Sequence, residues 1–407
     1  MKKLLASALI AALSVTLLAG CGAKKEEDIT LKVWCPQNQV ETGIMEKQQK
    51  AFEEAHPEWK INWVTEVVGE DVAKEQILKD PSVAGDVFFY ASDQLPELVA
   101  AGAIARLGGD TEKMVNETIA ESVVATAKVG EALYGIPFTH NTFFMYYDKT
   151  LLNDDDIKSL EKIVAKDTAK DVYNFYFESA GGWKLGCYYY GAGLNVFGPN
   201  GDDLKAGCNW NNETGIAVTK YLIDLINNPK VAYDGEVKVE ELAASHRIGA
   251  WFDGSWNFDL YKGVLGDDLG MAVIPTFNFD GTDRQLLSFY GSKCIGVNAM
   301  SKNAVAAVAF ATFLGNEENQ TLRYEMSAQI PANINAGNSE KVKADPLATV
   351  IVNEANTASV AQPASTVFSN RYWTPAGAIA TEIRSGLLTK DNVQVKMDQF
   401  VKTLTAE

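Results

Sequence analysis

Two kinds of side chain could give this chain a function: carboxylates beside aromatic residues, and tryptophans in loops. The carboxylates of this kind are Asp93, Glu178, Asp253 and Asp259. A glycoside hydrolase needs two carboxylates, one on each side of the bond that it cleaves. The sequence does not show which two of these residues, if any, would lie opposite each other. A carboxylate near the end of a strand can equally accept hydrogen bonds from sugar hydroxyls. We therefore expect these residues to serve binding rather than hydrolysis.

Tryptophan is the second candidate. The chain has 8 tryptophans, and several stand beside Gly, Ser, Pro or Asn rather than inside apolar runs. An indole can cover the apolar face of a pyranose while amides and carboxylates bind its hydroxyls. For any single tryptophan a place in the core is the more common role. Trp256 and Trp373 are the exceptions, because each stands in a loop just before a predicted helix.

Composition disfavours most other chemistries. Lys plus Arg is 36 against 53 Asp plus Glu, and the net charge of −17 has the wrong sign for binding nucleic acid. The chain has 3 His and 5 Cys with no paired spacing among them, so it offers few ligands for a metal centre built from His or Cys. A nucleophile elbow, a Walker loop, an HExxH motif and an EF-hand loop are missing by inspection. We expect no catalysis, no cofactor and no metal.

The first residues resemble a bacterial lipoprotein signal. Lysines precede an uncharged run over residues 4–18, and the small residues before Cys21 resemble a lipobox. The run of roughly 15 residues is too short to span a bilayer comfortably. We expect residues 1–20 to be a signal peptide, Cys21 to be lipidated, and residues 21–28 to be a tether. An ordinary secretion signal with a chance cysteine is the alternative.

The cysteines after residue 21 leave the disulfide state open. They are Cys35, Cys187, Cys208 and Cys294. An extracellular location permits disulfides, but the sequence cannot choose among the possible pairings. We expect buried free thiols, with Cys187 and Cys208 as the pair to test.

The rest of the chain alternates short apolar strands with amphipathic helices. Residues 29–34 and 59–68 have the pattern of strands, and residues 41–55 have the pattern of a helix. Residues 85–90 form a continuous apolar run of the kind that a buried parallel strand shows. A second set of such units occupies about residues 142–283, and a length of 407 residues suits two or three lobes. The pattern predicts α/β lobes that bind ligands beyond the carboxyl ends of their strands.

Five segments in order carry a family resemblance. They are ITLKVW (29–34), GDVFFYASDQ (85–94), YGIP with the stretch up to YDKTLL (134–152), GAWFDGSW (249–256) and GMAVIP (270–275). Together they resemble the extracellular solute-binding proteins of carbohydrate ABC importers, above all the maltose- and maltodextrin-binding type. The resemblance implies two lobes with mainly parallel sheets flanked by helices, and a hinge that closes them on the ligand.

The same resemblance implies a division of the chain and a set of ligand contacts. One lobe would comprise residues 29–139 and 286–328, and the other residues 140–285 and 329–407. The implied contacts are Trp34, Asn38, Gln39, Tyr90, Asp93, Gln94, Asn141, Trp183, Trp256 and Trp373. Gln94 and Asn141 stand where the maltose-binding type has a basic and an acidic residue, so the hydrogen-bond pattern must differ.

The implied function is that of a lipid-anchored, monomeric subunit at the outer face of the cytoplasmic membrane, extracellular or periplasmic. It would capture malto-oligosaccharides by hinge closure and deliver them to the permease, because three stacking aromatics suit a chain of glucose units. Two alternatives remain open. One is another cargo, such as a different oligosaccharide, a peptide or a polyol phosphate, although phosphate would call for Arg or Lys in the cleft. The other is a surface glycoside hydrolase or a lectin-like adhesin.

Overall fold

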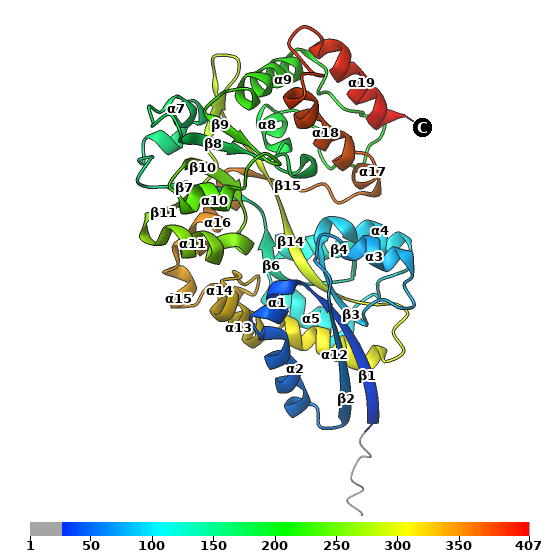
Figure 1. Ribbon diagram of the computed structural model, residues 1–407. Coiled ribbons are helices and arrows are strands. Elements are labelled where there is room, and N and C mark those ends of the chain that lie inside the picture. Colours follow the sequence, from blue (N-terminus) through cyan, green and yellow to red (C-terminus); the bar gives the residue numbers. More distant parts are fainter. Residues whose placement is uncertain (1–26, 407) are drawn as a thin grey trace, which may run out of the picture.

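The structure, a computed structural model, describes residues 27–406. Two sheets, each covered by helices, form two lobes that lie one above the other (Figure 1). This arrangement confirms the expected two-lobed α/β fold. The predicted signal peptide, the lipidation of Cys21 and nearly all of the tether fall outside the described residues.

The first lobe is built on a six-stranded sheet in which β14 pairs with β15, β3 and β6, and the order continues from β3 to β1 and β2. The strands are β1 (Glu27–Cys35), β2 (Trp59–Val67), β3 (Val87–Ala91), β6 (Ile136–Asn141), β14 (Ser288–Val297) and β15 (Ser359–Ala361). Every residue of β3 is buried, as its continuous apolar run predicts.

The second lobe is built on a five-stranded sheet in the order β11, β7, β10, β8, β9. Its strands are β7 (Phe144–Asp148), β8 (Tyr173–Phe177), β9 (Val231–Tyr233), β10 (Ile248–Asp253) and β11 (Leu269–Ala272). Both large sheets combine parallel and antiparallel pairs, and every antiparallel pair in them involves β14 or β7. The antiparallel strands thus adjoin the places where the chain passes between the lobes. Two short hairpins pair β4 (Lys128–Val129) with β5 (Ala132–Leu133) and β12 (Thr276–Asn278) with β13 (Asp283–Gln285).

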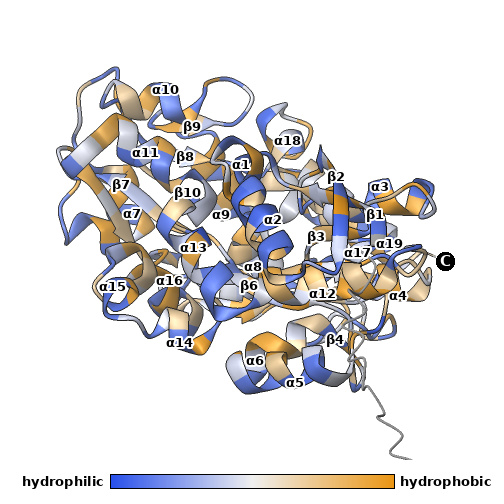
Figure 2. Ribbon diagram, turned by 90° about the horizontal axis from the view of Figure 1, so that it is seen from below, coloured by the Kyte–Doolittle hydropathy of each residue, from blue (hydrophilic) through white to orange (hydrophobic). Residues whose placement is uncertain are grey.

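Helices such as α2 (Ile44–Ala55) cover the sheets with amphipathic faces, and Figure 2 shows hydrophobic and hydrophilic residues mixed within the helices. The helix expected over residues 41–55 is broken at Gly43, whose φ of 73° interrupts the helical turn. Within residues 27–406 no helix is long and apolar enough to cross a membrane. The helices are α1 (Gln37–Glu41), α2 (Ile44–Ala55), α3 (Ala73–Lys79), α4 (Leu95–Ala100), α5 (Gly109–Thr118), α6 (Glu121–Val124), α7 (Leu160–Ala165), α8 (Gly186–Gly191), α9 (Glu213–Ile226), α10 (Val239–Ala244), α11 (Phe258–Leu265), α12 (Ala304–Gly315), α13 (Glu317–Ser327), α14 (Ile334–Gly337), α15 (Glu340–Lys343), α16 (Pro346–Thr357), α17 (Thr366–Ser369), α18 (Trp373–Arg384) and α19 (Val393–Thr405).

Three segments connect the lobes. Strands β6 and β14 lie between them in Figure 1, and Pro331 forms an isolated bridge with Thr139 of β6. Strand β14 starts at Ser288, and its first residues pair with β15. Phe289 packs in the core of the second lobe although the predicted division assigns it to the first. The contact of this one residue does not decide the domain boundaries, which stay a prediction.

All four cysteines within the described residues are buried free thiols, and Cys187 is not bridged to Cys208. Burial raises the pKa of Cys35, Cys208 and Cys294 to about 12.

A buried acid supports the crossing at the start of β14. Glu354 of α16 is fully buried, and its carboxyl accepts the backbone N–H of Ile274 at 2.9 Å. Its other oxygen lies 2.7 Å from the hydroxyl of Ser288, which in turn lies 3.0 Å from the hydroxyl of Thr142. Burial raises the pKa of Glu354 to about 8, so this carboxyl keeps its proton at neutral pH in the folded protein.

We expect the stability of this chain to fall between about pH 5 and pH 8 because of Glu354. Over this range the unfolded chain loses the proton of this carboxyl while the folded chain keeps it, which lowers the free energy of unfolding by up to about 1.4 kcal/mol per pH unit. The variant Glu354→Gln lacks this loss, so its stability relative to the wild type should rise with pH. Urea denaturation at several pH values measures the difference. Glu340→Gln, at an exposed position, is the control, and its difference in stability from the wild type should not change with pH. A difference for Glu354→Gln that is equally independent of pH would contradict the assignment.

Candidate functional site

A cleft of about 760 Å³ lies between the two lobes. One wall comes from loops at the carboxyl ends of β1, β2 and β3, and the other from the second lobe, while residues of the crossing strands β6 and β14 lie between them. The residues that line it are Pro36, Asn38, Glu70, Asp71, Lys74, Glu75, Ala91, Asp93, Gln94, Asn141, Ala180, Gly181, Trp183, Trp256, Lys293, Gln362 and Trp373. The first-lobe wall lies where ligands of α/β sheets are expected.

The second-lobe wall is aromatic, because Trp183, Trp256 and Trp373 all line the cleft and are half-buried. The rings of Trp183 and Trp256 lie 5.9 Å apart at 40°. The indole N–H of Trp183 donates to Oε1 of Gln362 at 3.0 Å. Trp373 packs edge-on against Phe368 at 5.3 Å. Flat rings held at one side of a cleft offer the surfaces on which pyranose rings stack.

Asp253 fixes the turn that carries Trp256. This carboxylate, at the end of β10, is 6% exposed and accepts the backbone N–H of Gly254 at 2.8 Å. Its second oxygen accepts the amide of Asn257 at 2.9 Å and the hydroxyl of Tyr261 at 2.6 Å. Asp253 is thus a structural residue, and its place behind Trp256 explains why a carboxylate stands beside this tryptophan in the sequence.

Trp183 and Trp373 are held together by a close contact between a short 3-10 helix, η4 (Ala180–Gly182), and α18. The hydroxyl of Tyr372 donates to the carbonyl of Gly182 at 3.0 Å. Gly182 has a φ of 95°, and a Cβ there would lie 2.7 Å from the Cβ of Ala376. Only glycine permits this approach, which brings the two tryptophans to the same wall.

The first-lobe wall is polar. Asp93 lies in the 3-10 helix η1 (Ser92–Gln94) after β3. Burial raises the pKa of Asp93 to about 6, and the ammonium of Lys74 and the amide of Gln362 partly oppose this rise. Asn38 Oδ1 has no hydrogen-bond partner among residues 27–406, so it can accept from a ligand. Asn141 lines the cleft from β6.

Gln94 lines the cleft but uses its amide to hold this wall. Its Nε2 donates to the carbonyls of Glu70 and Asp71, both at 2.7 Å. Its Oε1 accepts the backbone N–H of Lys74 at 3.0 Å. Because the amide is committed to these contacts, Gln94 positions the loop after β2.

Three residues predicted to contact the ligand, Trp34, Gln39 and Tyr90, are buried and do not line the cleft. Trp34 points its indole N–H away to Oε2 of Glu66, at 2.7 Å. The side chain of Gln39 is hydrogen-bonded to Gln329 at 3.0 Å. Tyr90 is fully buried. The structure therefore corrects their predicted place: they support the wall from the inside.

Several cleft residues were not anticipated: Glu70, Asp71, Lys74, Glu75, Lys293 and Gln362. Glu70 and Asp71 follow β2, so the rule that ligands sit at strand ends could have found them. No comparable signal exists for Lys293 and Gln362. They belong to β14 and to the residue after β15, and only the fold brings these together.

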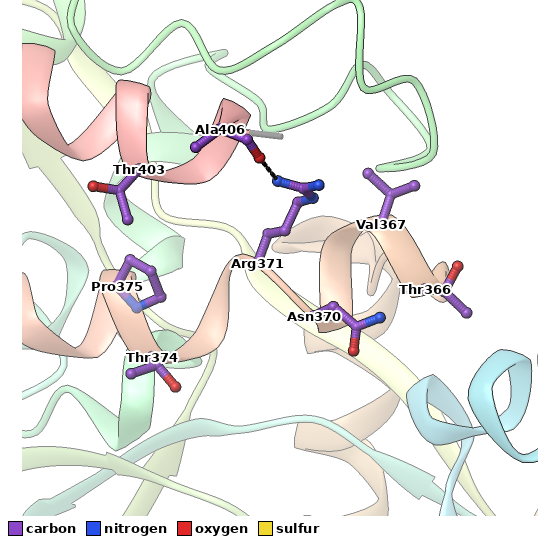
Figure 3. Close-up of a pocket in the computed structure, with 8 residues that line it drawn as sticks. All are labelled: Thr366, Val367, Asn370, Arg371, Thr374, Pro375, Thr403 and Ala406. Carbon is purple, nitrogen blue, oxygen red and sulfur yellow. Dashed lines mark hydrogen bonds between the residues drawn. The ribbon is translucent and has the colours of Figure 1, made fainter.

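A second hollow, of about 680 Å³, lies in the second lobe beside the end of α19. Figure 3 shows Arg371 reaching across it to the carbonyl of Ala406. The same guanidinium donates to the carbonyl of Leu404 at 3.1 Å. Its cation is thus used to cap a helix, and no aromatic residue lines the described part of this hollow. The cleft between the lobes is the stronger candidate site.

A family model described as a bacterial extracellular solute-binding protein matches residues 47–350. The chain belongs to this family. This solute-binding protein is 24% identical over 422 residues to a galactooligosaccharide-binding protein of Bacillus subtilis (strain 168), covering 97% of this chain and 94% of that one. It is 27% identical over 319 residues to a maltooligosaccharide ABC transporter solute-binding lipoprotein of Streptococcus pneumoniae (strain ATCC BAA-255 / R6), covering 74% and 72%.

A solved structure with acarbose is similar to this solute-binding protein with a TM-score of 0.87 and 35% sequence identity. The match covers 93% of this chain and 99% of the other. The shared architecture includes both lobes, which agrees with the position of the cleft between them.

We expect the variant Asp253→Asn of this solute-binding protein to be destabilised by on the order of 1–3 kcal/mol. An amide cannot accept on both sides, so one group among the backbone N–H of Gly254, Asn257 and Tyr261 would lose its acceptor inside the protein. Urea denaturation measures the change. Asp259→Asn, at an exposed neighbouring position, is the matched control. Equal stability of the two variants would show that Asp253 does not hold the turn.

Proposed function

We propose that this protein binds an oligosaccharide in the cleft between its lobes. The observation that carries the proposal is the pairing of three half-buried indoles on one wall with Asp93 and Asn38 on the other. Sugar rings have apolar faces and polar edges, and this cleft offers aromatic surfaces and hydrogen-bond acceptors on opposite sides.

Within this class we propose a malto-oligosaccharide as cargo: maltose, maltotriose or a longer chain. The name of the pneumococcal relative and the acarbose in the similar structure favour it. The name of the Bacillus subtilis relative favours a galacto-oligosaccharide, which is the second candidate. A polyol phosphate is disfavoured, because Lys74 pairs with Glu97 at 2.9 Å and Lys293 with Glu70 at 3.5 Å. Because both ammonium groups are already paired, the carboxylates of Asp71, Glu75 and Asp93 would repel an anionic ligand in the cleft.

The proposed mechanism is closure around the sugar. A ligand that contacts both lobes binds the closed form better than the open form and shifts the population toward it. The change would be confined to the three crossings, which consist of few residues around β6, the first half of β14 and Pro331. The closed protein would then present both lobes to an ABC permease. The protein makes and breaks no bond in this cycle.

We also propose that Cys21 carries a lipid anchor. The lipobox-like residues before Cys21 support this, and the pneumococcal relative is named a lipoprotein. Mass spectrometry of the full chain isolated from membranes should show acyl groups that Cys21→Ser lacks. An unmodified cysteine would leave only a secretion signal.

Truncating the stacking rings tests the cleft and its cargo together. We expect Trp256→Ala and Trp373→Ala each to weaken binding by about 1–3 kcal/mol, because each removes a buried contact surface. Calorimetric titration with maltotriose, a galacto-trisaccharide, cellotriose and glycerol 3-phosphate provides the measurement. Trp59→Phe, at a partly buried tryptophan that packs against the first-lobe core, serves as control. Unchanged affinity in both alanine variants would place the site elsewhere, and binding of the galacto-trisaccharide alone would change the cargo.

Binding should weaken below about pH 6 through Asp93. An ionised carboxylate accepts hydroxyl donors better than a neutral one, and the pKa of Asp93 in the free protein is about 6. Affinity should therefore fall by up to about tenfold per pH unit as the carboxyl takes up a proton. Titrations at pH 5 and pH 7.5 with the wild type and Asp93→Asn measure it. The asparagine variant should bind more weakly at pH 7.5 and depend less on pH. Stronger binding at pH 5 would mean that Asp93 donates to the sugar.

A further inference from the structure

We propose that Lys293 sets the affinity of the stacking position at Trp256, because its ammonium occupies the face of this indole that a sugar ring would take. The inference rests on the proposed sugar cleft. It goes further in naming an internal competitor for the ligand.

Lys293 lies on β14 between the two walls of the cleft. Its Nζ is 5.1 Å from the centroid of the Trp256 ring and 3.5 Å from Oε1 of Glu70. The side chains of Lys293 and Glu70 are only 14% and 10% exposed. Glu70 belongs to the first lobe and Trp256 to the second, so this lysine connects them. A cation held over an indole and shielded from water is attracted by the ring more strongly than an exposed one.

The backbone of Gly254 covers one side of the Trp256 ring. A Cβ at Gly254 would lie 2.0 Å from Cζ3 and 2.1 Å from Cη2 of the indole, so the ring packs directly on this glycine. Lys293 and Trp256 both line the cleft, where the ammonium lies over the indole that a sugar would have to reach. A pyranose cannot stack on the same face without moving the ammonium away.

The backbone and Glu70 both hold Lys293 in this place. The pairing of β14 with β6 shifts register between Lys293 and Cys294, a bulge of the kind that redirects a side chain. The carbonyl of Glu70 accepts the N–H of Ala91 at 3.1 Å and the amide of Gln94 at 2.7 Å, which fixes its loop. Oε1 of Glu70 has no hydrogen-bond partner within residues 27–406, so the ammonium at 3.5 Å is its nearest charge partner.

Lys293→Ala and Lys293→Arg test the inference in opposite directions. Alanine frees the face of Trp256, so the affinity for maltotriose should rise about three- to tenfold. Arginine stacks on an indole better than lysine does, so the affinity should fall by a similar factor. Because Lys293→Ala leaves Glu70 without its partner, the double variant Glu70→Gln/Lys293→Ala keeps the test valid if the single variant folds poorly. Weaker binding in both alanine variants, or unchanged affinity in all variants, would overturn the inference.

A measurement without sugar separates this inference from the proposed function. Quenching of tryptophan fluorescence by the neutral quencher acrylamide, compared with the same protein carrying Trp256→Phe, isolates the signal of Trp256. Lys293→Ala should increase the quenching of Trp256 about twofold, and Lys293→Arg should not. If the wild type binds no oligosaccharide but quenching follows this order, the function is wrong while Lys293 still covers Trp256. Equal quenching in all three proteins would overturn the placement of Lys293 itself.

Discussion

The rest of the structure depends on the hydrogen bonding of one strand, β14. Its first residues pair with β15, its middle with β6 and its last residues with β3, so a single ladder runs from one lobe into the other. A strand that leaves one sheet must find partners for its backbone groups, because buried N–H and C=O groups are costly when unpaired. Pairing β14 along its whole length meets this requirement at the crossing. It also places Ser288, Lys293 and the neighbouring Gln362 between the lobes.

The two walls of the cleft differ in chemistry because they differ in construction. The first-lobe wall consists of loops after parallel strands, where carbonyls and amides of the chain gather, and Gln94 holds these loops in shape. The second-lobe wall consists of tryptophans on short 3-10 turns and the start of α18, and buried contacts made by Asp253 and Tyr372 fix them. Rings on rigid supports lose little entropy when a ligand stacks on them. Asp253 and Tyr372 hold the tryptophans without lining the cleft, whereas Gln94 both lines the cleft and holds the first-lobe loops.

The sequence predicted three strands of the first lobe and the tryptophans Trp256 and Trp373 in loops, because apolar runs and loop position are local signals. The family resemblance placed Trp34 and Tyr90 in the cleft, but a strand turns successive side chains to opposite faces, so one step in register decides between cleft and core. Gln39 lies on the inner side of a helix too short to show a periodicity. Lys293 and Gln362 were missed because segments distant in the chain bring them together.

The four separate buried thiols of residues 27–406 affect how this protein withstands an oxidising medium. Oxidants and other thiols react with the thiolate, and burial keeps each of these groups protonated far above neutral pH. The folded lobes therefore protect their own cysteines in an oxidising medium. Unfolding removes the protection, since exposed thiols titrate normally and can cross-link before the chain refolds. Unfolding would then become irreversible. The lifetime of the folded protein would be set by its rate of unfolding rather than by its free energy of unfolding at equilibrium.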